Sequence, residues 1–244
     1  MYSSNQRVTS FLKITSFSTI CFLTFCFFLT LSPKAIYAND LYTSMTELME
    51  DTEEGSDWEI TYNNNQSNAL IAAIHGGNIE PGTSEVAKLT ATKGAYNYYS
   101  FQGIRSTNNA SLHVTSVNFD EPIIEDMQQQ VSNSVMIHGA NGDAPIVYIG
   151  GKDDALKASI EEQLELKDID VQTSPSHLEG EADENIVNKN NQNAGVQLEL
   201  TTGLRQSFFN NQDLTMNSRQ DQSNWSFAMY DFAQAIQTAI HEHE

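Results

Sequence analysis

The sequence is poor in cysteine, and the two cysteines that it has lie close together near the start of the chain. Cys21 and Cys26 both fall within the first 38 of the 244 residues. If that segment is removed, the remaining chain can form no disulfide, no thiolate metal site and no cysteine nucleophile. Any metal in the mature chain must therefore bind to His, Asp and Glu side chains.

Basic residues are also scarce. Lys and Arg number 12 against 32 Asp and Glu, which gives a net charge of −20. Arg7, Lys13 and Lys34 precede residue 39 and no acid does, so nine basic and 32 acidic residues remain after residue 38, a net charge of −23. Nucleic acids and anionic lipids bind to basic surfaces. The composition therefore argues against both as partners, and favours solubility outside the cell.

Long apolar runs are missing except for one near the start. Residues 20–31 are almost entirely apolar, follow the basic Arg7 and Lys13, and precede the small-residue sequence AIYA. A signal peptide has this order of parts, and the run is shorter than the roughly 20 residues of a transmembrane helix. We expect residues 1–38 to be a cleaved signal peptide, which makes the protein secreted and free of the membrane. An uncleaved membrane anchor is the alternative.

Several common catalytic signatures are absent. The chain contains no Gly-x-Ser-x-Gly turn, no P-loop and no His-Glu-x-x-His sequence. These absences argue against an α/β-hydrolase, a P-loop nucleotide hydrolase and a helical zinc-protease motif. A Ser-His-Asp triad stays open, because such triads share geometry rather than sequence.

The rest of the chain alternates between strand-like and helix-like segments. We expect residues 39–67 to form a lead-in with a short helical pattern and an edge strand, and residues 68–244 to form the main domain. We expect strands at 69–74, 96–101, 111–117, 131–137, 144–149 and 195–200, and a brief one from Val171. We expect helices at 84–92, 120–130 and 153–166, with a C-terminal helix after Trp225 and a long loop at 174–193. This alternation predicts an α/β sheet covered by helices on both faces.

Residues 69–87 organise the candidate site. An apolar strand ends at His75, a Gly-Gly turn leads to Glu80, and a helix follows Pro81-Gly82. Open α/β sheets bind ligands at the carboxyl ends of their strands. His and Glu are both zinc ligands. The alternative is that His75 only ends the strand and Glu80 is a solvated loop residue.

Two further strands end near candidate residues. His138 and Glu199 occupy these positions, so we expect them to meet His75 and Glu80 at one edge of the sheet. Two His and one Glu leave a fourth zinc position for water, whose pKa the metal lowers toward about 7. Glu199 is the candidate for transferring the proton to a leaving amine. A buried carboxylate is costly unless it is paired or used.

Other charged residues have weaker assignments. Arg105 and Arg205 are candidates for holding an oxyanion or a substrate carboxylate, although both could simply pair with surface acids. We expect His113 to lie inside a strand and to pack beside the site rather than bind the metal.

Several short blocks together resemble one known family. They are IHGGNIEPGTSE (74–85), GIRSTNN (103–109), LHVTS (112–116), FDEP (119–122), VMIHG (135–139) and NAGVQLELTTGLR (193–205). In this order they are similar to the poly-γ-glutamate hydrolase family of bacteriophages and their bacillus hosts, over residues 68–205. The resemblance implies a single α/β domain of zinc carboxypeptidase type, with a mixed, mostly parallel sheet flanked by helices.

The resemblance also implies functional roles. The implied zinc ligands are His75, Glu80 and His138, with Glu199 as general base. The implied substrate-binding residues are Arg105, which also helps catalysis, together with Arg205 and Asn109. Four residues separate the first His from the Glu, unlike the tighter His-x-x-Glu of ordinary carboxypeptidases, and this agrees with the phage type.

We therefore expect a secreted, monomeric bacterial zinc hydrolase that cleaves γ-glutamyl bonds in poly-γ-glutamate. Because the protein and this polymer are both acidic, a local basic groove or high ionic strength is needed. The alternatives are a zinc amidase of the same fold acting on peptidoglycan or an acyl-glutamate, and a binding module without activity. The sequence leaves open endo or exo cleavage, D or L selectivity, and preferred chain length.

Overall fold

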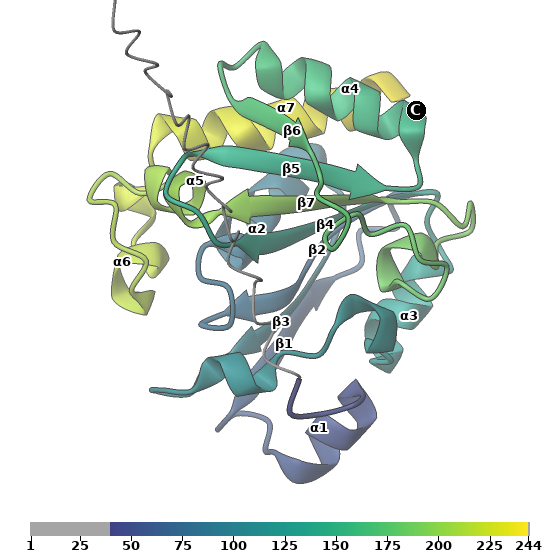
Figure 1. The fold of residues 1–244 in the computed structure, drawn as a ribbon, viewed down its shortest axis with the longest axis vertical. Coiled ribbons are helices and arrows are strands. Elements are labelled where there is room, and N and C mark those ends of the chain that lie inside the picture. The colour runs from purple at the N-terminus through teal and green to yellow at the C-terminus, as the bar shows by residue number, and fades with distance from the viewer. Residues whose placement is uncertain (1–39, 244) are drawn as a thin grey trace, which may run out of the picture. The chain divides into compact units, whose positions relative to one another are not determined.

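A seven-stranded sheet runs through the protein, seen in a computed structural model that describes residues 40–243 (Figure 1). The strands are β1 (Trp58–Asn63), β2 (Ala69–Gly77), β3 (Asn97–Gly103), β4 (Asn133–Ala140), β5 (Ile146–Gly151), β6 (Asp170–Thr173) and β7 (Val196–Thr201). Their order in the sheet is β1-β3-β2-β4-β7-β5-β6. The predicted signal peptide, residues 1–38, lies outside the described residues.

The sheet is mixed and mostly parallel, as expected. Strands β3, β2, β4 and β7 run parallel to one another at its centre. The edge strand β1 is antiparallel to β3, and β5 is antiparallel to β7, with β6 parallel to β5. The parallel centre follows from the helical crossovers between its strands.

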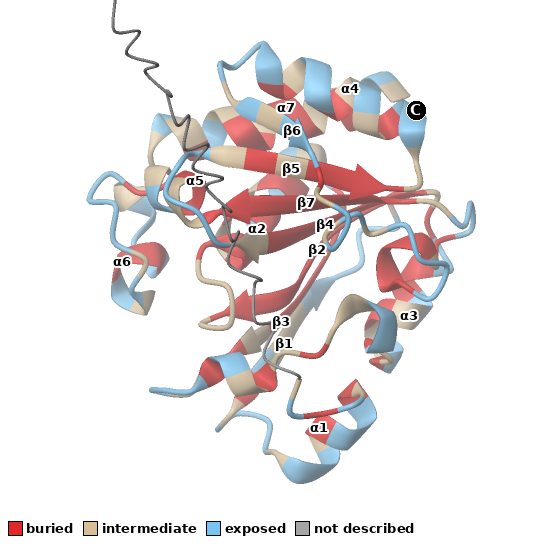
Figure 2. Cartoon of the chain, in the orientation of Figure 1, coloured by how far each residue is buried: buried red, intermediate tan, exposed pale blue. Residues whose placement is uncertain are grey.

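Helices cover both faces of the sheet, and Figure 2 shows buried strands beneath helices whose outer surfaces are exposed. The α-helices are α1 (Met45–Asp51), α2 (Thr83–Gly94), α3 (Pro122–Gln128), α4 (Asp154–Glu165), α5 (Thr202–Ser207), α6 (Met216–Gln220) and α7 (Phe227–His243). Helices α2, α4 and α7 share one apolar core with alternate strand residues such as Ile71 and Leu198. Helices α1 and α3 share the other core with Leu70 and Met136. The single-domain α/β fold is confirmed.

The C-terminal helix shows why a spaced apolar pattern predicts a buried face. Phe232, Ile236 and Ile240 in α7 recur every four residues and are fully buried against α2 and α4, as an amphipathic helix requires. Trp225, predicted to belong to the same stripe, lies just before the helix. None of the described helices is long and apolar enough to span a membrane.

One predicted strand is wrong. Residues 111–117 contain parts of two short 3₁₀ helices, Asn109–Leu112 and Ser116–Asn118, instead of a strand. The backbone between them bonds to side chains rather than to a neighbouring strand. The Val114 carbonyl accepts from His75 Nε2 at 2.8 Å, and the Thr115 amide donates to Asp40 at 2.6 Å. His113 therefore lies in a loop, not within a strand.

Candidate functional site

Three neighbouring parallel strands carry the residues that the sequence predicted to converge. His75 lies on β2, His138 on β4 and Glu199 on β7, and these strands are adjacent in the sheet. The register of β4 and β7 places His138 directly beside Glu199. His138 and Glu199 lie within their strands and not beyond the strand ends. Together with His75, they occupy the carboxyl-terminal halves of their strands. Parallel pairing therefore brings them to one edge.

A bulge in β2 aims His75 to the correct face. Ala73 pairs with Ser100 of β3 and Gly76 pairs with Gln102, so β2 contains one extra residue between these pairs. Strict alternation would turn His75 toward the core under α2. Its ring instead lies near Phe119 in the opposite core, with centroids 6.2 Å apart. Bulges often redirect a side chain in this way near active sites.

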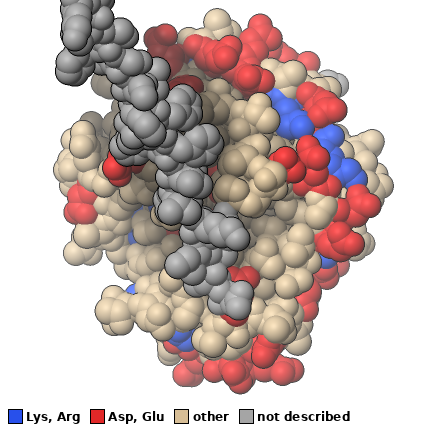
Figure 3. All heavy atoms as spheres, in the orientation of Figure 1, with Lys and Arg blue, Asp and Glu red and all other residues tan. Residues whose placement is uncertain are grey.

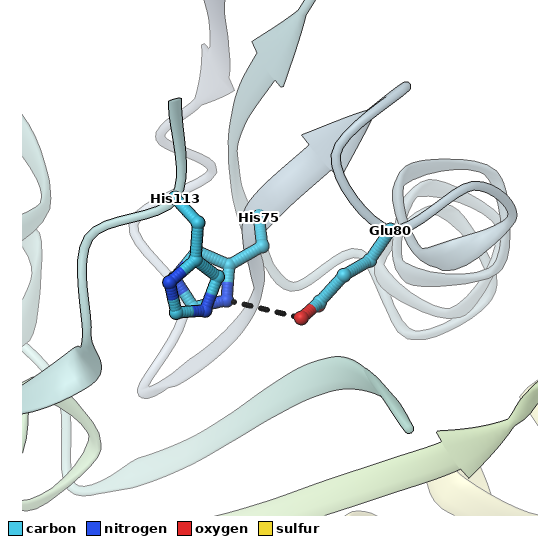
Figure 4. A group of neighbouring side chains, drawn as sticks. All are labelled: His75, Glu80 and His113. Carbon is cyan, nitrogen blue, oxygen red and sulfur yellow. Dashed lines mark ion pairs between the residues drawn. The ribbon is translucent and has the colours of Figure 1, made fainter. Parts of the chain in front are cut away.

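The loop after β2 folds Glu80 back onto His75. The Glu80 amide donates to the His75 carbonyl at 2.9 Å, and the Gly139 amide on β4 donates to Glu80 Oε2 at 2.8 Å. The turn needs glycine at position 77, where φ is +63° and a Cβ would lie 2.5 Å from the Gly103 carbonyl oxygen. Figure 4 shows Glu80 pointing back toward the imidazoles.

The donor atoms of His75, Glu80 and His138 face one another at short range. His75 Nδ1 lies 3.4 Å from Glu80 Oε1 and 3.2 Å from His138 Nδ1. His138 Nδ1 lies 3.9 Å from Glu80 Oε2. Ligand atoms around a tetrahedral zinc with bonds near 2.0–2.1 Å are about 3.3 Å apart. The three side chains therefore match the spacing of a zinc site.

The surroundings also suit metal binding. His75 Nε2 donates to the Val114 carbonyl oxygen, which leaves Nδ1 free to act as a ligand. His138 Nε2 is a buried nitrogen without a hydrogen-bond partner among the described residues. Buried polar atoms without a partner are few in folded proteins, and a catalytic or binding role is one explanation for such an atom.

His113 joins the same group of donors. One ligand atom from each of His75, Glu80 and His113 lies within 4.8 Å of the others. The rings of His75 and His113 lie against each other, with centroids 3.9 Å apart and planes tilted by 34° (Figure 4). Four donor side chains therefore gather here, and His75 and Glu80 belong to both possible sets of three.

Charge within the group keeps Glu80 ionised. Burial opposes its ionisation, but the charge and hydrogen bond of His75 outweigh burial and lower the pKa of Glu80 to about 2. Burial lowers the pKa of His138 to about 3, and the charge of His75 adds to this effect. Burial opposes the charged form of His75, but the charge of Glu80 outweighs burial and raises the pKa of His75. Glu80 and His138 are therefore in the protonation states that a metal requires, whereas His75 gives up its proton when a metal binds.

Glu199 has the opposite environment. Its side chain is buried, and Oε1 accepts a hydrogen bond from Gln197 Nε2 at 2.9 Å. Burial, followed by the negative charge of Glu80, raises the pKa of Glu199 to about 8. A carboxyl group that titrates near neutral pH can both accept and donate a proton during a reaction. The pKa values of the two carboxyl groups are thus shifted in opposite directions, a pattern that suits separate chemical roles.

The structure gives Arg105 and Asn109 a shared loop after β3. Arg105 Nε donates to Asp57 at 2.6 Å, and Nη1 donates to Ser111 at 2.9 Å. Asn109 is buried and bonds to both the amide and the carbonyl of Arg105, at 3.0 and 2.8 Å. Asn109 therefore fixes the backbone that carries the arginine. Their assignment to substrate binding stays a prediction.

Arg205 links the backbone segments around the site through hydrogen bonds. Its buried guanidinium donates to the carbonyl oxygens of Leu200, Pro81 and Ala140 at 2.8–3.1 Å. Its positive charge acts on both Glu80 and Glu199. These contacts hold Arg205 against the protein, and its predicted contact with substrate stays a prediction.

Sequence reasoning missed Arg219, the largest fully buried side chain among the described residues. It lies in α6 and pairs with Glu85 of α2 and with Asn78, which follows β2. No motif marked this residue, because its partners are 134 and 141 positions away.

Relatives in Bacillus subtilis strain 168 share most of the chain. The SPbeta prophage-derived UPF0714 protein YoqZ is 31% identical over 245 residues, which cover 99% of this chain and 87% of the relative. The UPF0714 protein YndL is 34% identical over 186 residues, covering 75% and 72% of the two chains.

Solved structures share the fold. A bacteriophage poly-gamma-glutamate hydrolase has a TM-score of 0.81 and 29% identity, covering 84% of this chain and 98% of its own. Zinc-free YNDL has a TM-score of 0.77 and 29% identity, covering 84% and 99%. Residues 42–235 also match the family described as poly-gamma-glutamate hydrolase. The chain therefore belongs to the poly-γ-glutamate hydrolase family.

Proposed function

We propose that this hydrolase is secreted and uses zinc to cleave γ-glutamyl amide bonds in poly-γ-glutamate. The observation that carries the proposal is the convergence of His75, Glu80 and His138 donors beside a buried Glu199. Family membership supports the hydrolase activity. The description of a related structure as zinc-free supports the choice of metal.

In this proposal zinc binds to His75, Glu80 and His138, whose donor distances suit tetrahedral coordination. Zinc at this position supplies Lewis acidity, which polarises a carbonyl group and makes water more acidic. Glu80 is held in place by the Gly139 amide. The protein thus contributes a pre-arranged set of donors rather than one assembled during the reaction.

Glu199 moves the proton. It accepts a proton from the attacking water and donates it to the departing α-amine, so that one carboxyl group acts first as base and then as acid. The neighbouring Gln197 holds one of its oxygens. Arg105 is the substrate-binding cation in this proposal, because part of its side chain remains exposed beside Asp57.

The acidic surface affects how the polymer approaches. Figure 3 shows acidic side chains along the top, the right edge and the bottom of one face, with basic ones mainly among them at the upper right. Repulsion between exposed charges extends over about 10 Å at 0.1 M salt. We therefore propose that screening by salt, together with Arg105 at the site, permits binding.

A polymer-size assay tests the proposal. Residues 39–244 are incubated with poly-γ-glutamate and, separately, with peptidoglycan, with and without a chelator and added zinc. Gel filtration should show shorter poly-γ-glutamate, with shortening stopped by the chelator and restored by zinc. Unchanged polymer with zinc-loaded protein contradicts the proposal. Cleavage of peptidoglycan alone would then favour the amidase, and binding of polymer without zinc would favour the binding module.

A further inference from the structure

Asp40, which precedes α1, places its carboxylate against His113 of the donor group. Asp40 Oδ1 lies 2.6 Å from His113 Nδ1, and Asp40 Oδ2 accepts from the Thr115 amide at 2.6 Å. One carboxylate therefore holds both the ring of His113 and the backbone just after it. Because Nδ1 donates to Asp40, Nε2 is the ring nitrogen left with a free lone pair.

The contact with Asp40 bears on metal binding because of where His113 lies. Its ring lies against that of His75, with the two planes tilted by 34°, and contributes a ligand atom to the group that includes Glu80. A carboxylate bonded to the far nitrogen of a metal-binding histidine fixes its tautomer and orientation and makes it a stronger donor. Asp40 and His113 form a carboxylate–histidine pair of this kind beside the proposed metal ligands, with its two members 73 positions apart.

We propose that Asp40 is a positioning residue, which holds His113 so that its imidazole strengthens metal binding at His75 and Glu80. The inference rests on the proposed zinc-dependent function. In the mature chain expected from the sequence, Asp40 is the second residue. Loss of two residues from that N-terminus would then weaken the metal site about as much as substitution of Asp40.

The contact can be tested without releasing the segment. Met45 and Leu48 of α1 are fully buried in the core on the site's side of the sheet. Asp120 holds the start of the same helix by accepting from the Met45 amide at 2.6 Å and from the Thr46 hydroxyl at 2.8 Å. Substitution of Asp40 therefore removes a local contact and leaves the segment in place. Asp120→Asn is the matched control, because Asp120 also bonds to this segment.

The test measures zinc affinity by competition with a chromophoric chelator, using residues 39–244, which form one compact unit. Asp40→Ala should weaken zinc binding about 10- to 100-fold, the usual effect of removing such a partner. Asp120→Asn should leave zinc affinity unchanged. His113→Ala should weaken binding at least as much as Asp40→Ala, and the double variant should be no weaker than His113→Ala alone, because Asp40 acts through His113.

The outcomes separate this inference from the proposed function. Unchanged zinc affinity in Asp40→Ala overturns the role of Asp40, while wild-type zinc binding leaves the proposed function intact. Additive losses in the double variant also overturn it, since Asp40 would then act independently of His113. A wild-type protein that binds no zinc overturns both. The visible spectrum of the cobalt-loaded protein supplies a second readout, which Asp40→Ala should alter and Asp120→Asn should not.

Discussion

Glu199 illustrates how one residue's surroundings define its chemistry. Its neighbours on β7 are apolar and buried, and the nearby Glu80 adds a negative charge. The folded protein therefore favours the protonated form. Such a group resembles a catalytic acid or base more than a structural carboxylate, which would be paired with a cation.

A pH-dependent stability difference follows for metal-free protein. The pKa of Glu199 rises from 4.5 to about 8 on folding, so its favourable contribution is complete below pH 4.5 and is lost as pH rises through about 8. Glu199→Gln lacks this loss. Its free energy of unfolding in urea, relative to wild type, should therefore increase between pH 5 and pH 8.

The exposed Glu161 supplies the control for removing one negative charge. Glu161→Gln should show no comparable increase over the same pH range. Equal stability of Glu199→Gln and wild type at every pH would mean that the carboxyl group is ionised in the folded protein, and would contradict its assigned environment.

At the scale of elements, strong local patterns were predictable and long-range contacts were not. The apolar run of β2 and the spaced stripe of α7 predicted their structures because each pattern is local. The 111–117 segment has β-forming residues, but its backbone bonds to His75 and Asp40 instead of to a strand. Helices α5 and α6 were missed because they are short and carry few apolar residues.

Some residues of the candidate site were likewise predictable from the sequence, and others were not. His75, His138 and Glu199 were predictable because each falls near the carboxyl end of a recognisable strand. Asp40 and the place of His113 in the donor group were not, since both depend on chain segments meeting across the fold. The helical pattern and the edge strand predicted in residues 39–67 correspond to α1 and β1, and residues from both are buried in the core.

Close packing between β4 and the loop of Glu80 gives a second prediction. A Cβ at position 139 would lie 2.9 Å from Cβ of Glu80 and 2.9 Å from Cζ of Arg205. Gly139→Ala should therefore displace Glu80 and reduce kcat/KM by roughly 10- to 100-fold, because small displacements of catalytic groups have large effects. Unchanged kinetics in a folded variant would show that Glu80 tolerates the shift and is not a close-fitting ligand.

The attachment of α6 gives a third prediction. Arg219 pairs with Glu85 in a buried site, and its loss would leave that carboxylate without a partner. Arg219→Ala should lower the free energy of unfolding by about 3–5 kcal/mol. Lys189→Ala, which removes a partly exposed pair with Glu125, should lower it by only about 0–1 kcal/mol. Equal small effects in urea unfolding would contradict the importance of the buried pair.

Over the whole molecule, the protein carries the same negative sign of charge as its proposed substrate. The net charge of −20 comes from acids spread over the chain, and the site itself holds the ionised Glu80 close to the positive charge of Arg205. General electrostatics therefore opposes the approach of a polyanion, and local contacts must favour its binding.

Salt dependence measures this balance. Raising ionic strength from 0.01 to 0.15 M shortens the screening length from about 30 to about 8 Å. KM for poly-γ-glutamate should fall over this range while kcat stays nearly constant. A short γ-glutamyl substrate, with fewer charges, should respond less. A KM that rises with salt would instead show that a basic surface attracts the polymer.

The role of Glu199 in proton transfer is tested by comparing zinc-loaded wild type with Glu199→Gln. The measured quantity is the release of new amino groups from poly-γ-glutamate. Zinc content is measured on the same samples. We expect equal bound zinc in both proteins and an amine-release rate at least about 100-fold lower in Glu199→Gln, the usual effect of losing a general base. Equal rates in the two zinc-loaded proteins would mean that another group transfers the proton and that Glu199 is not the general base.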